Sequence, residues 1–146
     1  MKVTTKGRYG LRIMVELAVQ HGSGPVLVTV IARNQAIPAK YIHVLIGGLK
    51  AAGLVTAVRG PNGGLELARE PGRITALDVV EALEGRLSAV DCTLDADLCD
   101  RAGDCVTREV WQDLAASMEA ALRRHTLADL AGRARTLAQR GDAYVI

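Results

Sequence analysis

The chain has 146 residues and a mass of 15.5 kDa, the size of one domain or of a small domain with an appendage. Hydrophobic residues make up 49% of it and charged residues 23%, which excludes a wholly disordered chain. No apolar run approaches the ~18–20 residues of a membrane span, and no apolar stretch follows the first lysines as in a secretory signal. We therefore expect a cytoplasmic protein with no membrane partner.

The net charge of +2 hides an uneven distribution. Up to Arg69 there are nine Lys and Arg against two acidic residues, a net charge of +7, and the remainder has nine basic and fourteen acidic residues, a net charge of −5. A basic first half favours contact with a polyanion such as nucleic acid. Phe is absent and only three Tyr and one Trp are present, which disfavours recognition of single strands by stacking.

The first part of the chain predicts a helix-turn-helix. Apolar residues at helical spacing and breakers between them indicate three helices, over residues 8–21, 29–35 and 38–52. Thr29 is the expected N-cap of the second helix, and Pro38 occupies the first turn of the third. A tight turn around Ala36 and Ile37 joins these two helices. Two glycines inside the third helix, Gly47 and Gly48, indicate close packing or a weak point.

A β-hairpin is expected directly after the third helix. Residues 54–58 (LVTAV) and 65–68 (LELA) have strand character, and the stretch RGPNGG between them has turn chemistry throughout. A hairpin at this place is a wing. Another helix is expected over 74–85, with Thr75 and Asp78 forming a capping box.

The remaining residues predict an ordered loop over 88–105, a long helix over 106–125, a short last helix over 126–134 and a loosely held tail. One apolar stripe runs along the long helix: Val106, Val110, Leu114, Met118 and Ala121. Such a stripe has little left to pack against except a second copy, so we expect a homodimer. The fold class is mainly α with a small β-hairpin. It divides into a winged helix-turn-helix domain (1–85) and a unit (86–146) with the cysteine loop and the long C-terminal dimerisation helix.

Double-stranded DNA is the expected partner of the first domain. A helix-turn-helix places the start of its second helix in the major groove, and an arginine at a wing tip can enter the minor groove. The candidate residues lie beside the first helix, at the start of the third helix and in the wing: Thr5, Lys6, Arg8, Ala39, Lys40, Tyr41, His43, Arg59, Gly60, Asn62, Gly63 and Gly64. Tyr41 shares the inward face of its helix with Leu45 and Leu49, whereas Lys40 and His43 lie nearer the outward face.

Three cysteines are confined to the predicted loop: Cys92, Cys99 and Cys105. In a cytosolic protein such a cluster indicates metal or redox chemistry rather than disulfides. Soft sulfur selects zinc or iron–sulfur, but the spacing lacks the Cys-x-x-Cys knuckle of structural zinc sites. Wider spacing suits a larger group wrapped by the chain, such as an iron–sulfur cluster with one ligand from elsewhere.

The sequence resembles the IscR/NsrR/RirA family of bacterial winged-helix regulators over about residues 1–132. The motifs are KGRYGLR (6–12), KY (40–41), LKAAGLV (49–55), VRGPNGG (58–64), ITALDVVEALEG (74–85), the three cysteines, CVTREVW (105–111) and TLADL (126–130). The resemblance implies a homodimeric, sequence-specific transcription factor, a repressor or activator. A [2Fe-2S] or [4Fe-4S] cluster on Cys92, Cys99 and Cys105 would then control its DNA affinity in response to iron, redox state or nitric oxide.

Two positions depart from the family. Arg108 stands where the iron–sulfur assembly regulators have a histidine three residues after the last cysteine. In the nitric-oxide sensors an acidic residue near position 8 of the partner subunit completes the site, and here this residue is Arg8. A zinc-bound site or an apo thiol switch is the alternative. An enzyme with a cysteine nucleophile is disfavoured because none of the three histidines lies in a catalytic motif. A pure protein-interaction adaptor would leave the basic half unexplained.

Overall fold

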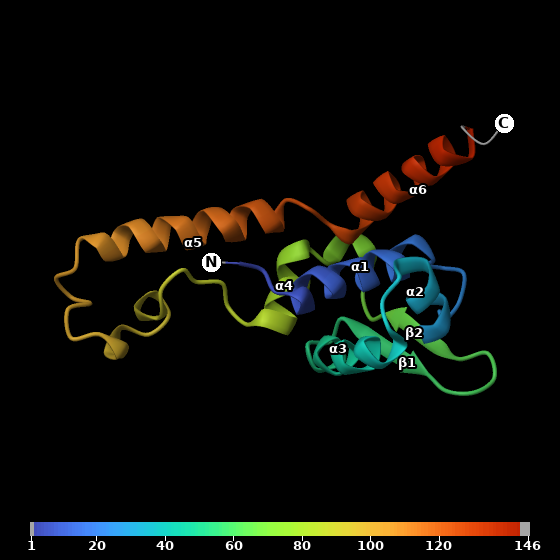
Figure 1. The fold of residues 1–146 in the computed structure, drawn as a ribbon, viewed down its shortest axis with the longest axis horizontal. Helices are drawn as coiled ribbons and strands as arrows, with labels where there is room; N and C mark the ends of the chain where they lie inside the picture. The colour runs from blue at the N-terminus through green and yellow to red at the C-terminus, as the bar shows by residue number, and fades with distance from the viewer. Residues whose placement is uncertain (1, 144–146) are drawn as a thin grey trace.

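The computed structural model describes residues 2–143. Its α-helices and strands are α1 (Thr5–Val19), α2 (Val28–Gln35), α3 (Ala39–Ala51), β1 (Val55–Val58), β2 (Gly64–Leu67), α4 (Ala76–Glu84), α5 (Thr107–Arg123) and α6 (Leu127–Ala143). Three short 3-10 helices are η1 (Pro71–Arg73), η2 (Asp91–Thr93) and η3 (Ala96–Leu98). Helices α1–α4 and the hairpin form one body, from which α5 and the segment before it extend (Figure 1). The predicted fold, mainly α with one small hairpin, is confirmed.

The turn between α2 and α3 depends on one left-handed residue. Ala36 has φ 50° and ψ 46°, and the following Ile37 amide donates to the Ala32 carbonyl at 3.1 Å. The side chain of Ile37 is buried in the core. The turn predicted here is therefore confirmed, and its apolar residue fastens α3 to the rest of the domain.

Helix α2 begins at Val28 with Leu27 as its N-cap, so the N-cap predicted at Thr29 is wrong. The reason is a non-local pairing just before the helix. Val26 forms an isolated antiparallel bridge with Leu65 of β2, with N···O distances of 2.9 and 2.8 Å. This bridge fixes the entry of the chain, and the helix starts before Thr29 is reached.

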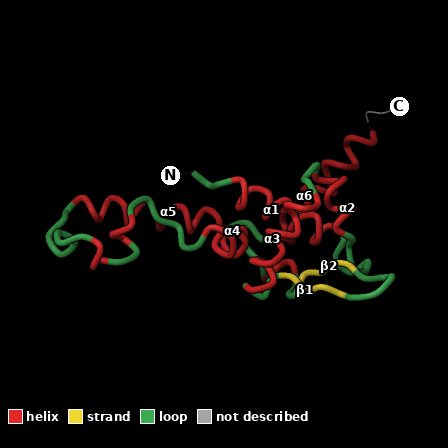
Figure 2. The backbone as a smooth tube through the Cα atoms, turned by 60° about the horizontal axis from the view of Figure 1, so that its bottom comes forward, coloured by secondary structure: helices red, strands yellow, loops and turns green. Residues whose placement is uncertain are grey.

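The wing is an antiparallel pair in the register Val55↔Leu67 to Val58↔Gly64. Gly64 has φ +151°, and a Cβ at this position would lie 2.5 Å from the carbonyl oxygen of Val26. A side chain here would separate the hairpin from the segment before α2, so glycine is required. Both figures of the whole chain place the hairpin directly beside α3 (Figures 1 and 2).

The last helix is longer than predicted. Helix α6 continues to Ala143, so the short helix over 126–134 and a loose tail from residue 137 are corrected as far as residue 143; residues 144–146 lie outside the described part. Arg135 explains part of this difference, because its guanidinium donates to the carbonyls of Ala18 and Val19 at 3.1 and 2.8 Å. These carbonyls belong to the end of α1, which α6 therefore caps.

Helix α6 also contributes to the main core. Leu127 and Ala131 are 0% and 1% exposed, and the Leu127 amide donates to the Ile74 carbonyl at 2.8 Å. The division of the chain at residue 85 stays a prediction. Leu127 and Ala131, which follow this boundary in the sequence, are part of the core of the first unit. The largest buried side chains are Ile13, Met14, Leu17, Ile31, Ile37, Ile42, Leu45, Leu49, Leu54, Ile74, Val79 and Leu127.

The first turn of α1 is held by a carboxylate from α4. Glu84 Oε1 accepts hydrogen bonds from the Thr4 amide at 2.9 Å, the Thr4 hydroxyl at 2.6 Å and the Gly7 amide at 3.0 Å. Burial alone would raise the pKa of Glu84. The hydrogen bonds from Thr4 and Gly7 and the charge of Lys6 together outweigh burial, so the pKa of Glu84 lies below its ordinary value. A carboxylate at a helix N-terminus stabilises the exposed amides and the helix dipole.

Replacing Glu84 with glutamine is expected to lower the free energy of unfolding at pH 7 by about 1 kcal/mol, as for a lost helix cap. Because the folded pKa is depressed, the stabilisation is present above the unfolded pKa of about 4.3 and is lost as pH falls through the folded pKa. Thermal unfolding of both proteins between pH 7 and pH 3 measures this. Glu81→Gln on the same helix is the control, and a pH-independent difference for Glu84→Gln would contradict the assignment.

Candidate nucleic-acid interface and cysteine segment

The start of α3 presents polar side chains on one face and core side chains on the other. Lys40 and His43 are exposed, as is Val44 at 63%, and Ala39 is half-buried. Tyr41 is half-buried, and its ring packs edge-on against Tyr9 of α1 with centroids 5.7 Å apart. The outward residues have the placement that a major-groove helix needs, while Tyr41 fixes the helix against α1.

The wing tip presents Arg59 and Asn62, both exposed. Gly60 has φ +107° and its carbonyl accepts from the Gly63 amide at 3.0 Å, which closes the tip. A Cβ at Gly63 would lie 2.1 Å from the Val58 carbonyl oxygen, so this position also requires glycine. Gly63 is buried and Gly64 half-buried, so these two build the tip and leave Arg59 and Asn62 to reach outward.

Thr5, Lys6 and Arg8 form the exposed first turn of α1. The Arg8 guanidinium donates to the Thr5 hydroxyl at 3.4 Å. Within residues 2–143 the one ion pair closer than 4 Å joins His21 and Glu70 at 3.5 Å. Lys6 is close enough to Glu84 for its charge to lower the pKa of that carboxyl, but no described carboxylate lies within 4 Å of a cation at the start of α1, on α3 or in the wing. This leaves these cations available for phosphate.

A buried carboxylate that the sequence did not single out holds α2 against α1. Glu16, 7% exposed, accepts hydrogen bonds from the side-chain amides of Gln20, Asn34 and Gln35, the last two at 2.8 Å. Arg12 adds hydrogen bonds to the carbonyl and side chain of Gln35. The available signal was a single acidic residue between Val15 and Leu17 in the helix predicted over 8–21, since a buried carboxylate needs hydrogen-bond partners.

The three cysteines lie in one segment but differ in exposure. Cys92 and Cys105 are half-buried, Cys99 is exposed, and all three are free thiols. Arg108 joins two of them: its Nε donates to the Cys92 carbonyl at 3.0 Å and its amide to the Cys105 carbonyl at 3.1 Å. The departure from the family at Arg108 thus has a structural role, because this side chain ties η2 to the first turn of α5.

Cys105 precedes the N-terminus of α5. The Thr107 hydroxyl, 3.2 Å from Cys105 Sγ, and the Arg108 amide lower the pKa of the Cys105 thiol, against a smaller opposing effect of burial; the Thr107 amide and the charge of Arg101 lower it further. A depressed pKa raises the thiolate fraction, and the thiolate is the form that reacts and ligates.

Within the described residues no three His, Cys, Asp or Glu side chains are grouped closely enough to hold a single metal ion. A zinc site needs four ligands at one tetrahedral centre and a cluster needs its thiolates gathered at one place, so this arrangement does not favour one of them over the other. Three free thiols nevertheless have the donor chemistry that iron–sulfur clusters use. Cys92, Cys99 and Cys105 would be the ligands from this chain, with one ligand still to be supplied.

Helix α5 has no buried residue. Its apolar side chains Val110, Trp111 and Leu114 are 57%, 37% and 39% exposed, and Val106, the N-cap residue before it, is 78% exposed. An exposed apolar stripe of this length is typical of an interaction surface. No helix within residues 2–143 is long and apolar enough to cross a membrane.

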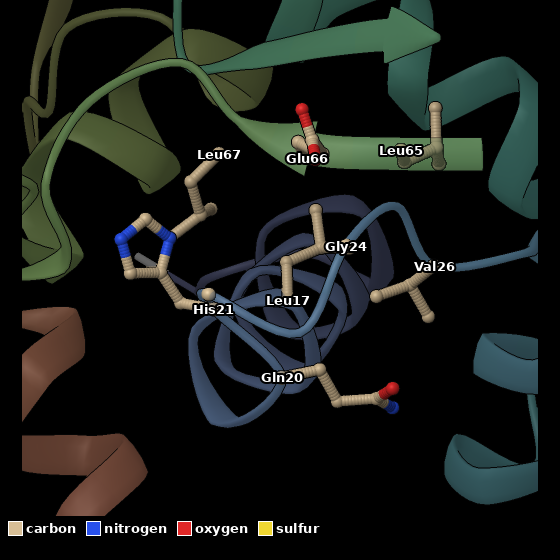
Figure 3. Close-up of a pocket in the computed structure, with 9 residues that line it drawn as sticks. Leu17, Gln20, His21, Gly24, Val26, Leu65, Glu66 and Leu67 are labelled. Carbon is tan, nitrogen blue, oxygen red and sulfur yellow. The ribbon is translucent and has the colours of Figure 1, made fainter. Parts of the chain in front are cut away.

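A cavity of about 250 Å³ lies between the end of α1, the turn at 22–25 and β2. Leu17, His21 and Leu65 are among the side chains around it (Figure 3). None of the predicted DNA-contacting residues or cysteines lines this cavity, so it does not enter the account of the site.

The sequence is similar to known transcriptional regulators over most of its length. The family model described as "Rrf2: Iron-dependent Transcriptional regulator" matches residues 3–133. The HTH-type transcriptional regulator CymR of Bacillus subtilis is 40% identical over 131 residues, 90% of each chain. The HTH-type transcriptional regulator IscR of Cronobacter sakazakii is 34% identical over 89% of this chain and 80% of its own.

Solved structures give the same result. The structure of B. subtilis CymR, called the global cysteine regulator, matches with a TM-score of 0.75 and 40% identity over 91% of this chain and 98% of that one. The structure of T. potens IscR matches with a TM-score of 0.75 and 40% identity over 92% and 88%. The winged-helix architecture predicted from the sequence is therefore confirmed.

Proposed function

Because the chain belongs to the Rrf2 family of DNA-binding transcription regulators and is not an enzyme, we propose that its affinity for an operator is controlled by an iron–sulfur cluster on Cys92, Cys99 and Cys105. The observation that carries this proposal is the confinement of all three cysteines, each a free thiol, to one segment that Arg108 ties to the exposed helix α5. The protein would act in the cytoplasm, where the operator is.

The DNA contacts are assigned to three neighbouring elements. Lys40, His43 and the methyl group of Ala39 read the major groove, with Lys40 on phosphate or guanine. Arg59 enters the minor groove, and Asn62 adds a polar contact beside it. The first turn of α1 supplies phosphate contacts that place the protein without reading sequence. The exposed cations of these elements, none within 4 Å of a described carboxylate, support this assignment.

A homodimer is the proposed assembly, formed by pairing of α5 with its copy. The seventeen residues of this helix include none that is buried, and Val110, Trp111 and Leu114 are exposed on it. Twofold pairing would bury this stripe and place two DNA-reading heads at a fixed separation. Sedimentation equilibrium is then expected to give twice the chain mass of 15.5 kDa.

The chain's own residues suggest how the segment acts. Arg108 holds Cys92 to the start of α5, so a change at the cysteines moves this helix and the spacing of the two heads. When bound, an iron–sulfur cluster would be the part of the protein that iron shortage, oxidants or nitric oxide remove or alter. The fourth ligand is assigned to no residue of this chain, because Arg8 and Arg108 occupy the two family positions.

One observation favours a second candidate, a thiol switch without a cluster. The pKa of Cys105 is lowered by Thr107 and Arg108, and Cys99 is exposed, so both thiols are open to oxidation. The related CymR of B. subtilis is named as a cysteine regulator. Zinc is the remaining variant, for which the described residues offer no ready group of ligands.

A visible absorption spectrum of protein purified without oxygen, combined with iron, sulfide and zinc assays, separates these candidates. We expect visible bands with iron and sulfide near stoichiometric amounts, and their loss in a Cys92→Ser variant. Ser117→Ala on α5, outside the segment, is the control. A colourless wild-type protein that also resists cluster reconstitution would overturn the cluster, and its zinc content would then decide between a zinc site and a free thiol switch.

A further inference from the structure

The side chain of Leu83 fills the space beside two glycines, Gly10 of α1 and Gly48 of α3. A Cβ at Gly10 of α1 would lie 2.0 Å from Cδ1 of Leu83, and a Cβ at Gly48 of α3 would lie 3.1 Å from its Cδ2. The two methyl groups of this side chain therefore rest against the bare backbones of α1 and α3. A larger residue at either glycine would push the helices apart.

The next residue, Glu84, holds the first turn of α1. Glu84 accepts hydrogen bonds from Thr4 and Gly7, and a Cβ at Gly7 would lie 2.8 Å from Glu84 Oε1. The last turn of α4 thus contacts α3, which reads the DNA, and the first turn of α1, which binds phosphate. The two glycines of the GRYG motif, unexplained by DNA contact, both serve this packing.

The same turn is where the cysteine segment begins. Gly85, with φ +82°, ends α4, and residue 86 leads directly toward Cys92. A cavity of about 270 Å³ lies on this side of the turn, with Val3, Glu84, Arg86 and Met118 among its walls. The last turn of α4 packs against α1 and α3, and this cavity lies between the turn and the start of the segment.

We propose that Leu83 is the positioning residue that fixes α3 relative to α1, and that it passes the state of segment 86–105 to both helices. A displacement that begins at residue 86 moves the last turn of α4 as a unit, because the space beside it is open. Leu83 then carries the displacement into both glycine contacts at once. The second half of this proposal rests on the proposed control of DNA affinity by the cysteines.

The positioning role is tested with Leu83→Ala, compared with Leu77→Ala on the same helix. Leu77 is 4% exposed and is not among the atoms nearest to Gly10 or Gly48. The probe is a duplex that the wild-type protein selects from a randomised library, with a shuffled duplex as competitor. We expect Leu83→Ala to lower the ratio of the two affinities about tenfold, while Leu77→Ala stays within twofold of wild type, at a temperature where both are folded.

Gly48→Ala keeps the test decisive if Leu83→Ala does not fold. Alanine stabilises a helix interior relative to glycine, but here its methyl group presses on Leu83. We expect a lower affinity ratio without loss of thermal stability. An unchanged ratio in Gly48→Ala, or in folded Leu83→Ala, would overturn the positioning role.

The transmission role is tested by chelation followed by alkylation with iodoacetamide, which modifies only the cysteine segment because the chain has no other cysteine. Alkylation is expected to change the affinity of wild type and Leu77→Ala for the selected duplex, and to leave Leu83→Ala unchanged. A full response in Leu83→Ala would overturn transmission through this residue. No response in the wild type would instead overturn the proposed function and transmission together, while the affinity ratios still decide the positioning role.

Discussion

Replacing Leu127 with alanine is expected to lower the free energy of unfolding by about 2–5 kcal/mol, the cost of truncating a buried leucine. Leu127 is 0% exposed, and it lies in the core although it follows the extended helix α5 in the sequence. Its amide also donates to the Ile74 carbonyl, and the Ala76 amide donates to the His125 carbonyl at 2.8 Å. The start of α6 is therefore part of the winged-helix body.

Leu137→Ala is the matched control, because it makes the same change on the same helix at a side chain that is 66% exposed. Urea or thermal unfolding of both variants measures the difference, and the control is expected within about 0.5 kcal/mol of wild type. Equal stabilities for the two variants would show that α6 does not pack on the body as described.

Removing Lys40 and Arg59 together is expected to weaken binding to the selected duplex about 100-fold or more. Each contributes about 1–3 kcal/mol if it reaches a base edge or a groove, and the contributions of separate contacts add. Both side chains are exposed and have no carboxylate partner within the described residues. The slope of log affinity against log salt concentration is also expected to become shallower, since fewer counterions are released.

Arg140→Ala on α6 is the control, because it removes one positive charge at an exposed position away from α3 and the wing. Fluorescence anisotropy over a series of salt concentrations measures both quantities. If the double variant bound the selected duplex within twofold of wild type, neither α3 nor the wing would be the reading surface.

Local signals in the sequence were sufficient for the winged-helix body. Pro38 before α3 and the glycine-rich stretch after Arg59 mark turns by their own backbone preferences. The capping box at Thr75 and Asp78 is confirmed by two reciprocal hydrogen bonds of 2.8 and 3.2 Å. Each of these features lies within a few residues of the element it starts or ends, so a single sequence carries it.

Contacts between distant residues could not be predicted in this way. Glu84 meets Thr4 across 80 positions, and Arg135 meets Ala18 across 117. The length of α6 was missed because a glycine at 141 and polar residues weaken its local period, and the distant contact of Arg135 with α1 cannot be seen in the sequence. The contact of Leu83 with Gly10 and Gly48 was equally invisible, although the second glycine did signal close packing.

The cysteine segment was predicted from the sequence only in part. The absence of a helical or strand period over 88–105 predicted an ordered loop, and two short 3-10 helices, η2 and η3, lie in it. It did not predict that Arg108 would tie Cys92 to α5 or that Cys99 would remain exposed. The cluster on these cysteines stays a prediction, because three free thiols can ligate either an iron–sulfur cluster or zinc.

The affinity of the protein for its selected duplex, before and after chelation and alkylation of the three thiols, tests the central claim most directly. All three thiols lie in the segment from Cys92 to Cys105, so the treatment leaves the residues proposed to contact DNA unmodified. Control through this segment predicts a change in affinity of about 5- to 150-fold, the usual range of coupling between two sites. Equal affinities before and after treatment, with the protein still folded, would contradict the account.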